Sequence, residues 1–354
     1  MREGRGLAAR SRHARVTIRE VAEDAGVSVA AVSKVLRDAY GVSEALRTKV
    51  QASIVRLGYR PHAAARGMRG QTYTLGLLLP DLHNPFFADI MAGINTALER
   101  TQYQTLIGVS ESATSVETAL IEAMVDRQMD GVMLVGPRMQ SPDLVSVAAR
   151  LPMVLIGRYA PPAANFDTVN NDDRLGAALV VQHLAAAGYR HIAYLGQELS
   201  DPEAVMVTTR RETGFRAAMG ELGLGRHLQV VNAQQSSRAV QGAARHLLQI
   251  RNRPDAIFCW TDFIALEVLS VARELGLDVP GDVAVVGYDN TWYCDLAQNA
   301  LTSIDQSGQV LGLQAARLLI ERIKGRSQAE HFVVTPRLVA RSSSRTRGSH
   351  PTGT

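Results

Sequence analysis

Short apolar runs alternate with amphipathic stretches over most of the chain, from Thr72 onward. The runs are almost continuously apolar, whereas the stretches between them carry apolar residues at helical spacing. Strands that are apolar on both faces and separated by helices predict parallel sheets covered by helices on both sides. We expect strands at 74–81, 105–111, 131–137, 152–158, 191–197, 229–234, 255–262 and 283–290, with helices at 86–100, 175–187, 209–222 and 240–250 among the stretches between them.

This strand–helix region is too long for one open sheet. The chain has 354 residues, 46% of them hydrophobic, which suffices for two or three packed cores. Eight strand–helix units are too many for one comfortable open sheet, so we expect two lobes. Parallel sheets of this kind bind ligands at the carboxyl ends of their strands, which places the expected ligand in the cleft between the lobes.

The N-terminal region differs from the rest in charge. Residues 1–70 contain 14 Lys and Arg against 6 Asp and Glu, a net charge of +8, and the remaining chain then carries 24 against 28, a net charge of −4. A basic segment on a mildly acidic body suggests contact with a polyanion. A solubilising basic tail is the alternative on charge alone.

The pattern inside residues 16–57 predicts three short helices. Thr17 and Glu20 form the T-x-x-E signature of a capping box, and Gly26 permits the positive φ of a tight turn. Ser28 is a good N-cap for a second helix that ends at about Leu36, and a third helix follows at about 43–57. This arrangement fits a DNA-reading helix-turn-helix, and a generic three-helix bundle is the alternative.

The motif VTIREVAEDAGVSVAAVSKVL resembles the N-terminal signature of the lactose-repressor (LacI/GalR) family of transcription regulators, and VSEALRTKVQASIVRLGYRPHAAAR resembles its third helix and hinge. PDLHNPFFADIMAGI, RRETGF, TDFIALEVLSVARELGL, DVAVVGYDN and LTSIDQ resemble segments of the family's body, so the resemblance covers about residues 16–341. It implies an N-terminal all-α helix-turn-helix domain and an α/β two-lobed domain with parallel sheets, like periplasmic sugar-binding proteins, whose chain crosses between the lobes three times.

The resemblance also implies domain boundaries. We expect a basic disordered arm at 1–15, the helix-turn-helix domain at 16–60, a hinge at 61–71, the effector-binding domain at 72–341 and a disordered tail at 342–354. Within the effector-binding domain we expect the first lobe at about 72–165 and 304–327, and the second at about 166–303 and 328–341.

By this resemblance the second helix enters the major groove of DNA. Lys34 can reach guanine O6 or N7, although many relatives carry Arg there and Lys lacks its bidentate fork. Val29 and Ala30 offer no hydrogen bonds and can read only thymine methyls or shape. Met68 of the hinge is the candidate wedge for the minor groove, and a plain flexible linker is the alternative for that segment. The expected DNA-binding residues are Thr17, Ser28, Val29, Ala30, Ser33, Lys34, Arg37 and Met68.

Two cleft residues match the family's ligand-binding positions most directly. Arg211 matches its ligand-binding arginine and Asp289 its aspartate, which accepts hydrogen bonds from hydroxyls. A structural ion pair between the lobes is the alternative for these two, core packing is the alternative for Phe86 and Phe87, and a surface loop for Trp292. The expected effector-binding residues are Asn84, Phe86, Phe87, Arg158, Arg211, Thr261, Asp262, Asp289, Trp292 and Gln306.

Two departures from the family pattern bear on the effector. Thr261 and Gly157 stand where relatives often carry Asn and Asp. Both departures remove hydrogen-bonding reach, which weakens the expectation that the effector is a common hexose. Arg158, beside Gly157, could compensate or favour an anionic ligand.

We therefore expect a repressor that binds a pseudo-palindromic DNA operator as a homodimer, with affinity controlled by a sugar or sugar derivative. The outer helices around 90–98 and 117–125 are the expected pairing surface. We expect no cofactor, no metal and no enzymatic activity, because the chain lacks catalytic motifs and its two cysteines cannot form a four-ligand zinc site. No apolar run spans a bilayer and no secretory signal is found, so we expect a cytoplasmic, nucleoid-associated protein. A solute-binding protein and a sugar-modifying enzyme are the rivals.

Overall fold

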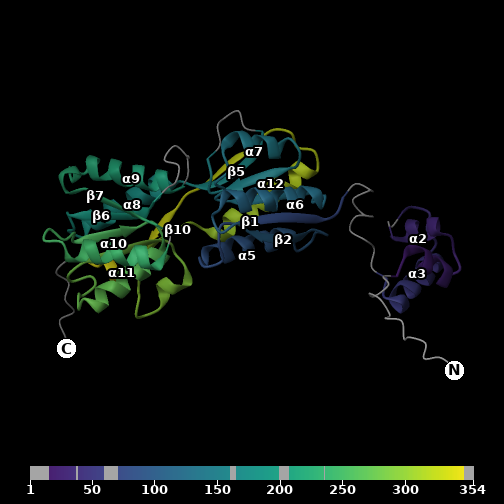
Figure 1. Cartoon of the computed structure of the whole chain (residues 1–354), viewed down its shortest axis with the longest axis horizontal. Coiled ribbons are helices and arrows are strands. Elements are labelled where there is room, and N and C mark those ends of the chain that lie inside the picture. The colour runs from purple at the N-terminus through teal and green to yellow at the C-terminus, as the bar shows by residue number, and fades with distance from the viewer. Residues whose placement is uncertain are drawn as a thin grey trace, which may run out of the picture. The chain divides into compact units, whose positions relative to one another are not determined.

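The computed structural model describes residues 16–36, 39–59, 71–159, 165–198, 207–234 and 236–346. The chain divides into two compact units, Met1–Thr72 and Tyr73–Thr354, called here the head and the body (Figure 1). No helix among the described residues is both long and apolar enough to cross a membrane. The arm at 1–15 and the hinge, except for Gln71, lie outside the described residues.

The head has the three predicted helices, α1 (Ile18–Asp24), α2 (Val29–Leu36) and α3 (Glu44–Leu57). The capping box at the start of α1 is confirmed, because Thr17 Oγ1 accepts from Glu20 N–H while Glu20 accepts from the Thr17 backbone. Ser43 caps α3, and Gly58 ends it in the left-handed conformation that glycine favours. Apolar residues from all three helices form the small core: Val21, Ala22, Ala25, Val32, Val35 and Val50.

The first lobe of the body is built on a six-stranded, wholly parallel sheet. Its strands in spatial order are β11 (His331–Val334), β5 (Asp167–Asn171), β4 (Met153–Ile156), β3 (Gly131–Val135), β1 (Thr74–Leu79) and β2 (Gln104–Val109). One face is covered by α5 (Phe86–Leu98) and α12 (Gly308–Ile323), and the other by α6 (Thr114–Asp126) and α7 (Ser141–Ala148).

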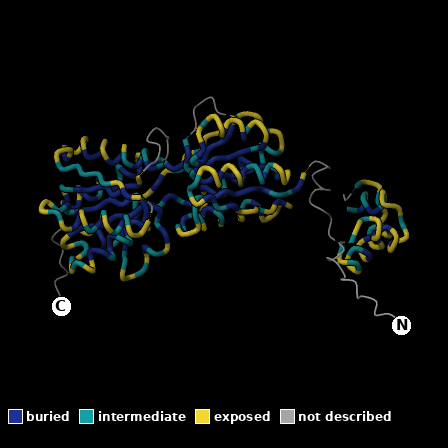
Figure 2. Tube along the Cα trace, in the orientation of Figure 1, coloured by how far each residue is buried: buried dark blue, intermediate teal, exposed yellow. Residues whose placement is uncertain are grey.

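The second lobe repeats this plan with one antiparallel edge strand. Its order is β12 (Arg337–Val339), β10 (Thr302–Asp305), β9 (Ala284–Asp289), β8 (Ala256–Cys259), β6 (Ile192–Gln197) and β7 (Gln229–Ala233), and β12 is antiparallel to β10. One face is covered by α8 (Asp173–Ala186) and α9 (Val207–Glu221), the other by α10 (Ser237–Gln249) and α11 (Asp262–Glu274). Short 3₁₀ turns lie at Gly225–His227, Trp292–Asp295 and Ser342–Ser344. Figure 2 shows the buried strands inside each lobe and the exposed outer faces of the helices.

The eight predicted strands and four predicted helices of the body are confirmed, but four further strands were not predicted and shift the lobe boundaries. Strands β5 and β11 lie in the first lobe, although 166–303 and 328–341 were expected in the second. This placement is stabilised by Asp167 of β5, a fully buried carboxylate that lies 3.0 Å from Arg322 of α12 and 2.6 Å from Arg326. The chain crosses between the lobes after β5, β10 and β11, so the three expected crossings are present.

The C-terminal segment does not begin to be disordered at 342, as was expected. Ser342–Ser344 form a 3₁₀ turn on the second lobe, and Ser343 and Ser344 are buried there. Ser343 Oγ donates to Val285 O at 2.6 Å and accepts from Thr302 N–H at 2.9 Å. Backbone groups of β9 and β10 thus provide hydrogen-bond partners for a polar segment that the sequence pattern gave no reason to bury. Residues 347–354 lie outside the described residues.

The apolar faces of the two helices expected to pair in a dimer are already covered within the first lobe. Ile90, Ile94 and Leu98 of α5 pack in the core beneath α12. The two helices approach so closely that a Cβ on Gly312 would lie 1.9 Å from Ile90 O. The buried residues of α6, which include Ile121 and Met124, face the opposite core. Only the outward sides of these helices are left for contact with a second copy of the chain, and pairing through them stays a prediction.

Candidate functional site

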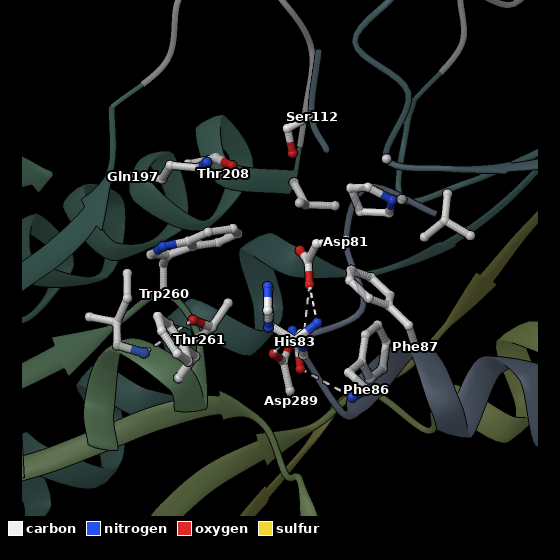
Figure 3. Close-up of a pocket in the computed structure, with 18 of the residues that line it drawn as sticks. Asp81, His83, Phe86, Phe87, Ser112, Gln197, Thr208, Trp260, Thr261 and Asp289 are labelled. Carbon is white, nitrogen blue, oxygen red and sulfur yellow. Dashed lines mark hydrogen bonds between the residues drawn. The ribbon is translucent and has the colours of Figure 1, made fainter. Parts of the chain in front are cut away.

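A cavity of about 1170 Å³ lies between the two lobes of the body. It is larger than the roughly 300–1,000 Å³ of ordinary small-molecule pockets. It is lined by the segments that follow β1–β4 in the first lobe and β6–β9 in the second, with Gln306 after β10. The expectation that the cavity lies at the carboxyl ends of the strands is therefore confirmed. Figure 3 shows Phe87 of the first lobe and Trp260 of the second on opposite sides of it.

The first-lobe wall is shaped by the loop between β1 and α5. Asp81 Oδ1 accepts the N–H groups of His83 at 2.8 Å and Asn84 at 3.1 Å, and Asn84 Oδ1 accepts that of Phe86 at 3.1 Å. These bonds start α5 so that Phe86 and Phe87 line the cavity, with ring centroids 6.2 Å apart. Phe86 also packs in the buried core of the lobe, so for this residue the core-packing and cavity-lining interpretations both hold.

The second-lobe wall contains a buried cluster around Arg211 of α9. Its Nε donates to Asp173 Oδ1 at 2.8 Å, its Nη1 to Trp260 O at 2.6 Å and its Nη2 to Gln306 Oε1 at 3.2 Å. The side chains of Arg211 and Asp173 are 3% and 0% exposed. Burial alone lowers the pKa of the guanidinium, but Asp173, Tyr288 and Asp289 together outweigh burial and the net shift of the pKa is upward. Burial raises the pKa of Asp173, against the opposing effect of Arg211.

Asp289, in the second lobe, is hydrogen-bonded both to the first lobe and to a segment that crosses between the lobes. It accepts from Asn84 Nδ2 of the first lobe at 2.8 Å, and from Gln306 Nε2 of the crossing after β10 at 2.5 Å. Its φ of +117° lies in a region that L side chains rarely adopt, and such strain concentrates at functional sites. Burial raises the pKa of Asp289 to about 8, although Arg211 opposes the shift. Arg211 Nη1 lies 4.0 Å away from Asp289 Oδ1 and both belong to the second lobe, so the alternative of an ion pair between the lobes is wrong.

Asp262 was expected in the cleft, but it does not line the cavity. Its Oδ2 accepts from Thr291 N–H at 2.7 Å, Thr291 Oγ1 at 3.0 Å and Cys294 Sγ at 3.1 Å, and its Oδ1 from Ser303 Oγ at 2.6 Å. These four donors turn the buried carboxylate into the lobe. Its neighbour Thr261 does line the cavity and also caps α11.

Arg158 and Trp292 also lie outside the cavity lining. Arg158 is buried, and its Nη1 donates to Pro137 O at 2.8 Å. Trp292 is 58% exposed and stacks on Tyr293 at 3.9 Å between centroids, as its surface-loop alternative predicts. The structure thus brings seven of the ten expected effector residues to the cavity: Asn84, Phe86, Phe87, Arg211, Thr261, Asp289 and Gln306.

Several lining residues were not predicted. They include Asp81, Glu111, Glu198 and Trp260, each within two residues of the end of a strand. Applying the carboxyl-end rule strand by strand would have found them. The indole Nε1 of Trp260 is buried and has no hydrogen-bond partner among the described residues.

The head presents the N-terminal part of α2 to solvent. Ser28, Val29, Ala30 and Lys34 are exposed, and Ser33 is partly buried. Ser28 Oγ accepts from Ala31 N–H at 3.1 Å, which orders the first turn of the helix. Of the other three expected DNA-binding residues, Arg37 and Met68 lie outside the described residues, and Thr17 caps α1. No group of His, Cys, Asp and Glu in the described parts of the chain could hold a metal ion.

Two family models match the chain. Residues 17–62 match the model "Bacterial regulatory proteins, lacI family", and residues 181–344 match "Periplasmic binding protein-like domain". Catabolite control protein A of Priestia megaterium is 30% identical over 91% of this chain and 96% of its own length. The HTH-type transcriptional repressor CytR of Escherichia coli K12 is 29% identical over 90% of this chain and 93% of its own length.

Solved structures agree in fold. The transcriptional regulator CelR in complex with cellobiose has a TM-score of 0.68 and 29% identity, and the match covers 93% of this chain and 100% of CelR. The lac repressor dimer bound to operator has a TM-score of 0.81 over 94% of this chain and 99% of its own, at 23% identity. Because the relatedness spans both the head and the body, the chain belongs to the lacI family of bacterial regulatory proteins.

Proposed function

We propose that this DNA-binding regulator represses transcription by holding a pseudo-palindromic operator as a homodimer, and that a sugar or sugar derivative between its lobes changes its affinity for DNA. As a member of its family the protein is a transcription regulator and not an enzyme. The proposal concerns the operator contacts, the dimer and the effector.

The exposed face of α2 supports operator reading by the head. A helix in the major groove reads bases with the residues near its N-terminus, and here these are Val29 and Ala30, with Lys34 one turn further along. Two apolar side chains and one cation favour a half-site in which thymine methyls lie beside a guanine.

The cavity supports control by a small molecule, and the observation that carries this is the position of Gln306. Its side chain contacts Arg211 and Asp289 in the cavity, while its carbonyl accepts from Asn171 Nδ2 at 2.6 Å, at a second crossing between the lobes. A ligand that competes for Asp289 therefore acts on the segments about which the lobes would rotate. Coupling of this kind is typically worth about 1–3 kcal/mol and is reciprocal.

The carbohydrate class is supported by two relatives. CelR is solved as a cellobiose complex, and a LacI-family regulator from Enterococcus faecium with bound ribose has a TM-score of 0.68 and 25% identity, covering 77% of this chain and 99% of its own. Aromatic side chains beside acceptor groups in the cavity suit the C–H faces and hydroxyls of a sugar.

An edge strand supports pairing of two copies. Leu106 and Ile107 of β2 are 51% and 45% exposed, and within the described residues β2 pairs only with β1. Exposed apolar residues on an edge strand are a template for association. Ile107→Glu is expected to yield monomers in analytical ultracentrifugation and to weaken operator binding, whereas an unchanged dimer would refute this surface.

Operator recognition is tested with the full chain and a fragment selected from random or genomic DNA. Lys34→Ala should reduce the preference for that fragment over random duplex by about 1–3 kcal/mol, or roughly 5- to 150-fold. Lys49→Ala, an exposed lysine on α3, serves as the matched control and should leave this preference unchanged. If no fragment is preferred at moderate ionic strength, with or without sugars, the proposed function is wrong.

A further inference from the structure

The cavity carries acidic side chains from both lobes. Asp81 and Glu111 line it from the first lobe and Glu198 from the second. No ion pair joins any of the three to a Lys or Arg within the parts of the chain that the structure describes. Each follows the end of a strand, so the three approach the same space from different strands.

The two arginines that line the cavity offset only part of this charge. Arg211 is bound to buried Asp173 at 2.8 Å and lies 4.0 Å from Asp289, so its charge is already opposed inside the lobe. Arg138 adds one positive charge against the three carboxylates, because only its backbone N–H binds the buried carboxylate of Glu117, at 3.1 and 3.0 Å. A ligand that entered the cavity would therefore meet an excess of negative charge.

The three carboxylates add hydrogen-bond acceptors to the cavity and no donors. Ionised carboxylates only accept hydrogen bonds, and the side-chain amides of Asn84 and Gln306 already donate to Asp289. The indole N–H of Trp260 is the buried donor with no partner among the described residues. A complementary ligand must bring donors of its own, as hydroxyl groups do and as phosphate and carboxylate groups do not.

We propose that the cavity selects an uncharged, polyhydroxylated ligand and excludes the acidic and phosphorylated forms of the same molecule. This inference rests on the proposed carbohydrate class and narrows it. It also goes against one of the two roles considered for Arg158 from the sequence, that of favouring an anion, because Arg158 donates to Pro137 O outside the cavity lining.

The test compares matched sugars on the full-length protein by isothermal titration calorimetry. The probes are cellobiose with cellobionic acid, and glucose with gluconate and glucose 6-phosphate. We expect a neutral sugar to bind and its anionic partner to bind about 100-fold more weakly, since like charges in a partly desolvated cleft repel strongly. An anionic form that binds as tightly as its neutral parent, or more tightly, overturns the inference.

Charge-removing variants separate electrostatic exclusion from poor shape. Glu198→Gln keeps the size of the side chain and should reduce the discrimination against the anionic sugar about tenfold. Glu221→Gln removes an exposed carboxylate at the end of α9, outside the cavity lining, and should leave the discrimination against the anionic sugar unchanged. Equal discrimination in both variants would show that charge at Glu198 does not exclude anions.

The outcomes distinguish this inference from the proposed function. If no sugar of the panel binds, the polyhydroxylated class is wrong, while operator binding is measured independently in the head variants. If a neutral sugar binds with the expected discrimination but leaves operator affinity unchanged, the inference stands and effector control of DNA binding fails.

Discussion

The buried pair of Arg211 and Asp173 should dominate the stability of the second lobe. Arg211→Met keeps an unbranched side chain of similar length but removes the cation that lies 2.8 Å from Asp173. The carboxylate would keep the hydroxyls of Tyr159 at 3.1 Å and Tyr288 at 3.3 Å as its side-chain donors among the described residues.

The expected loss follows from this geometry. Breaking a buried pair by removing one partner costs about 3–5 kcal/mol, because the remaining charge is uncompensated. For a domain of this size each kcal/mol lowers the melting midpoint by about 2–4 °C, so the body should melt about 6–20 °C lower. Arg210→Ala is the adjacent control, since Arg210 is only partly buried and stacks on Tyr159 at 3.6 Å; it should cost much less.

The loss should depend on pH with a definite sign. Burial already raises the pKa of Asp173, and without Arg211 the pKa would rise further. Between the unfolded pKa of about 4 and the raised folded value, the folded state holds a proton that the unfolded chain has released, so stability falls as pH rises. The deficit of Arg211→Met should therefore be larger at pH 8 than at pH 5.

Denaturant unfolding followed by tryptophan fluorescence and circular dichroism measures these differences, and Asp173→Asn in the Arg211→Met background completes the design. Removing the stranded charge should recover part of the lost free energy at pH 8 and little at pH 5. The reasoning would be refuted if Arg211→Met lowered the free energy of unfolding by less than about 1 kcal/mol, or lowered it equally at both pH values.

Four further substitutions test local packing and capping. Gly312→Ala should destabilise the first lobe by about 1–3 kcal/mol or more, because its Cβ meets a backbone carbonyl of α5 at 1.9 Å. Gly242→Ala, on α10 with open space around it, should instead stabilise by about 0.5–1 kcal/mol, and thermal melts of the two compare them directly. Thr17→Ala removes the capping side chain of α1 and should cost the head about 1 kcal/mol, seen as faster amide hydrogen exchange in α1. Ser343→Ala leaves the buried Thr302 N–H without its acceptor and should cost about 1–3 kcal/mol in denaturant unfolding, whereas an unchanged midpoint would contradict the role of this turn.

The sequence predicts much of the fold because its signals are local. The capping box at Thr17, the turn at Gly26 and the apolar strands can each be predicted from a few neighbouring residues, and all are confirmed. Strand β5 (DTVNN) was missed because its burial comes from long-range partners. Asp167 is stabilised by arginines some 155 residues later in the chain, which no local pattern shows.

The candidate site divides in the same way. The position of Arg211 could be predicted from its motif, but its main partner, Asp173, could not, because nothing in the sequence places α8 beside α9. Asp262 has the residue type and the position after a strand that indicate a ligand contact. Only the fold shows that Ser303 and Thr291 donate hydrogen bonds to its carboxylate inside the lobe.

The three crossings between the lobes have a consequence for how the protein is made on the ribosome. Helix α12 covers one face of the first sheet, and β12 completes the edge of the second, yet both come from the last stretch of the described chain. The first lobe cannot close its hydrophobic core while α12 is still inside the exit tunnel, and the second lobe lacks an edge strand until β12 emerges. The head, whose core is local to residues 16–59, can fold while the body is still being translated, so a nascent chain would expose a finished DNA-binding domain before the body has folded.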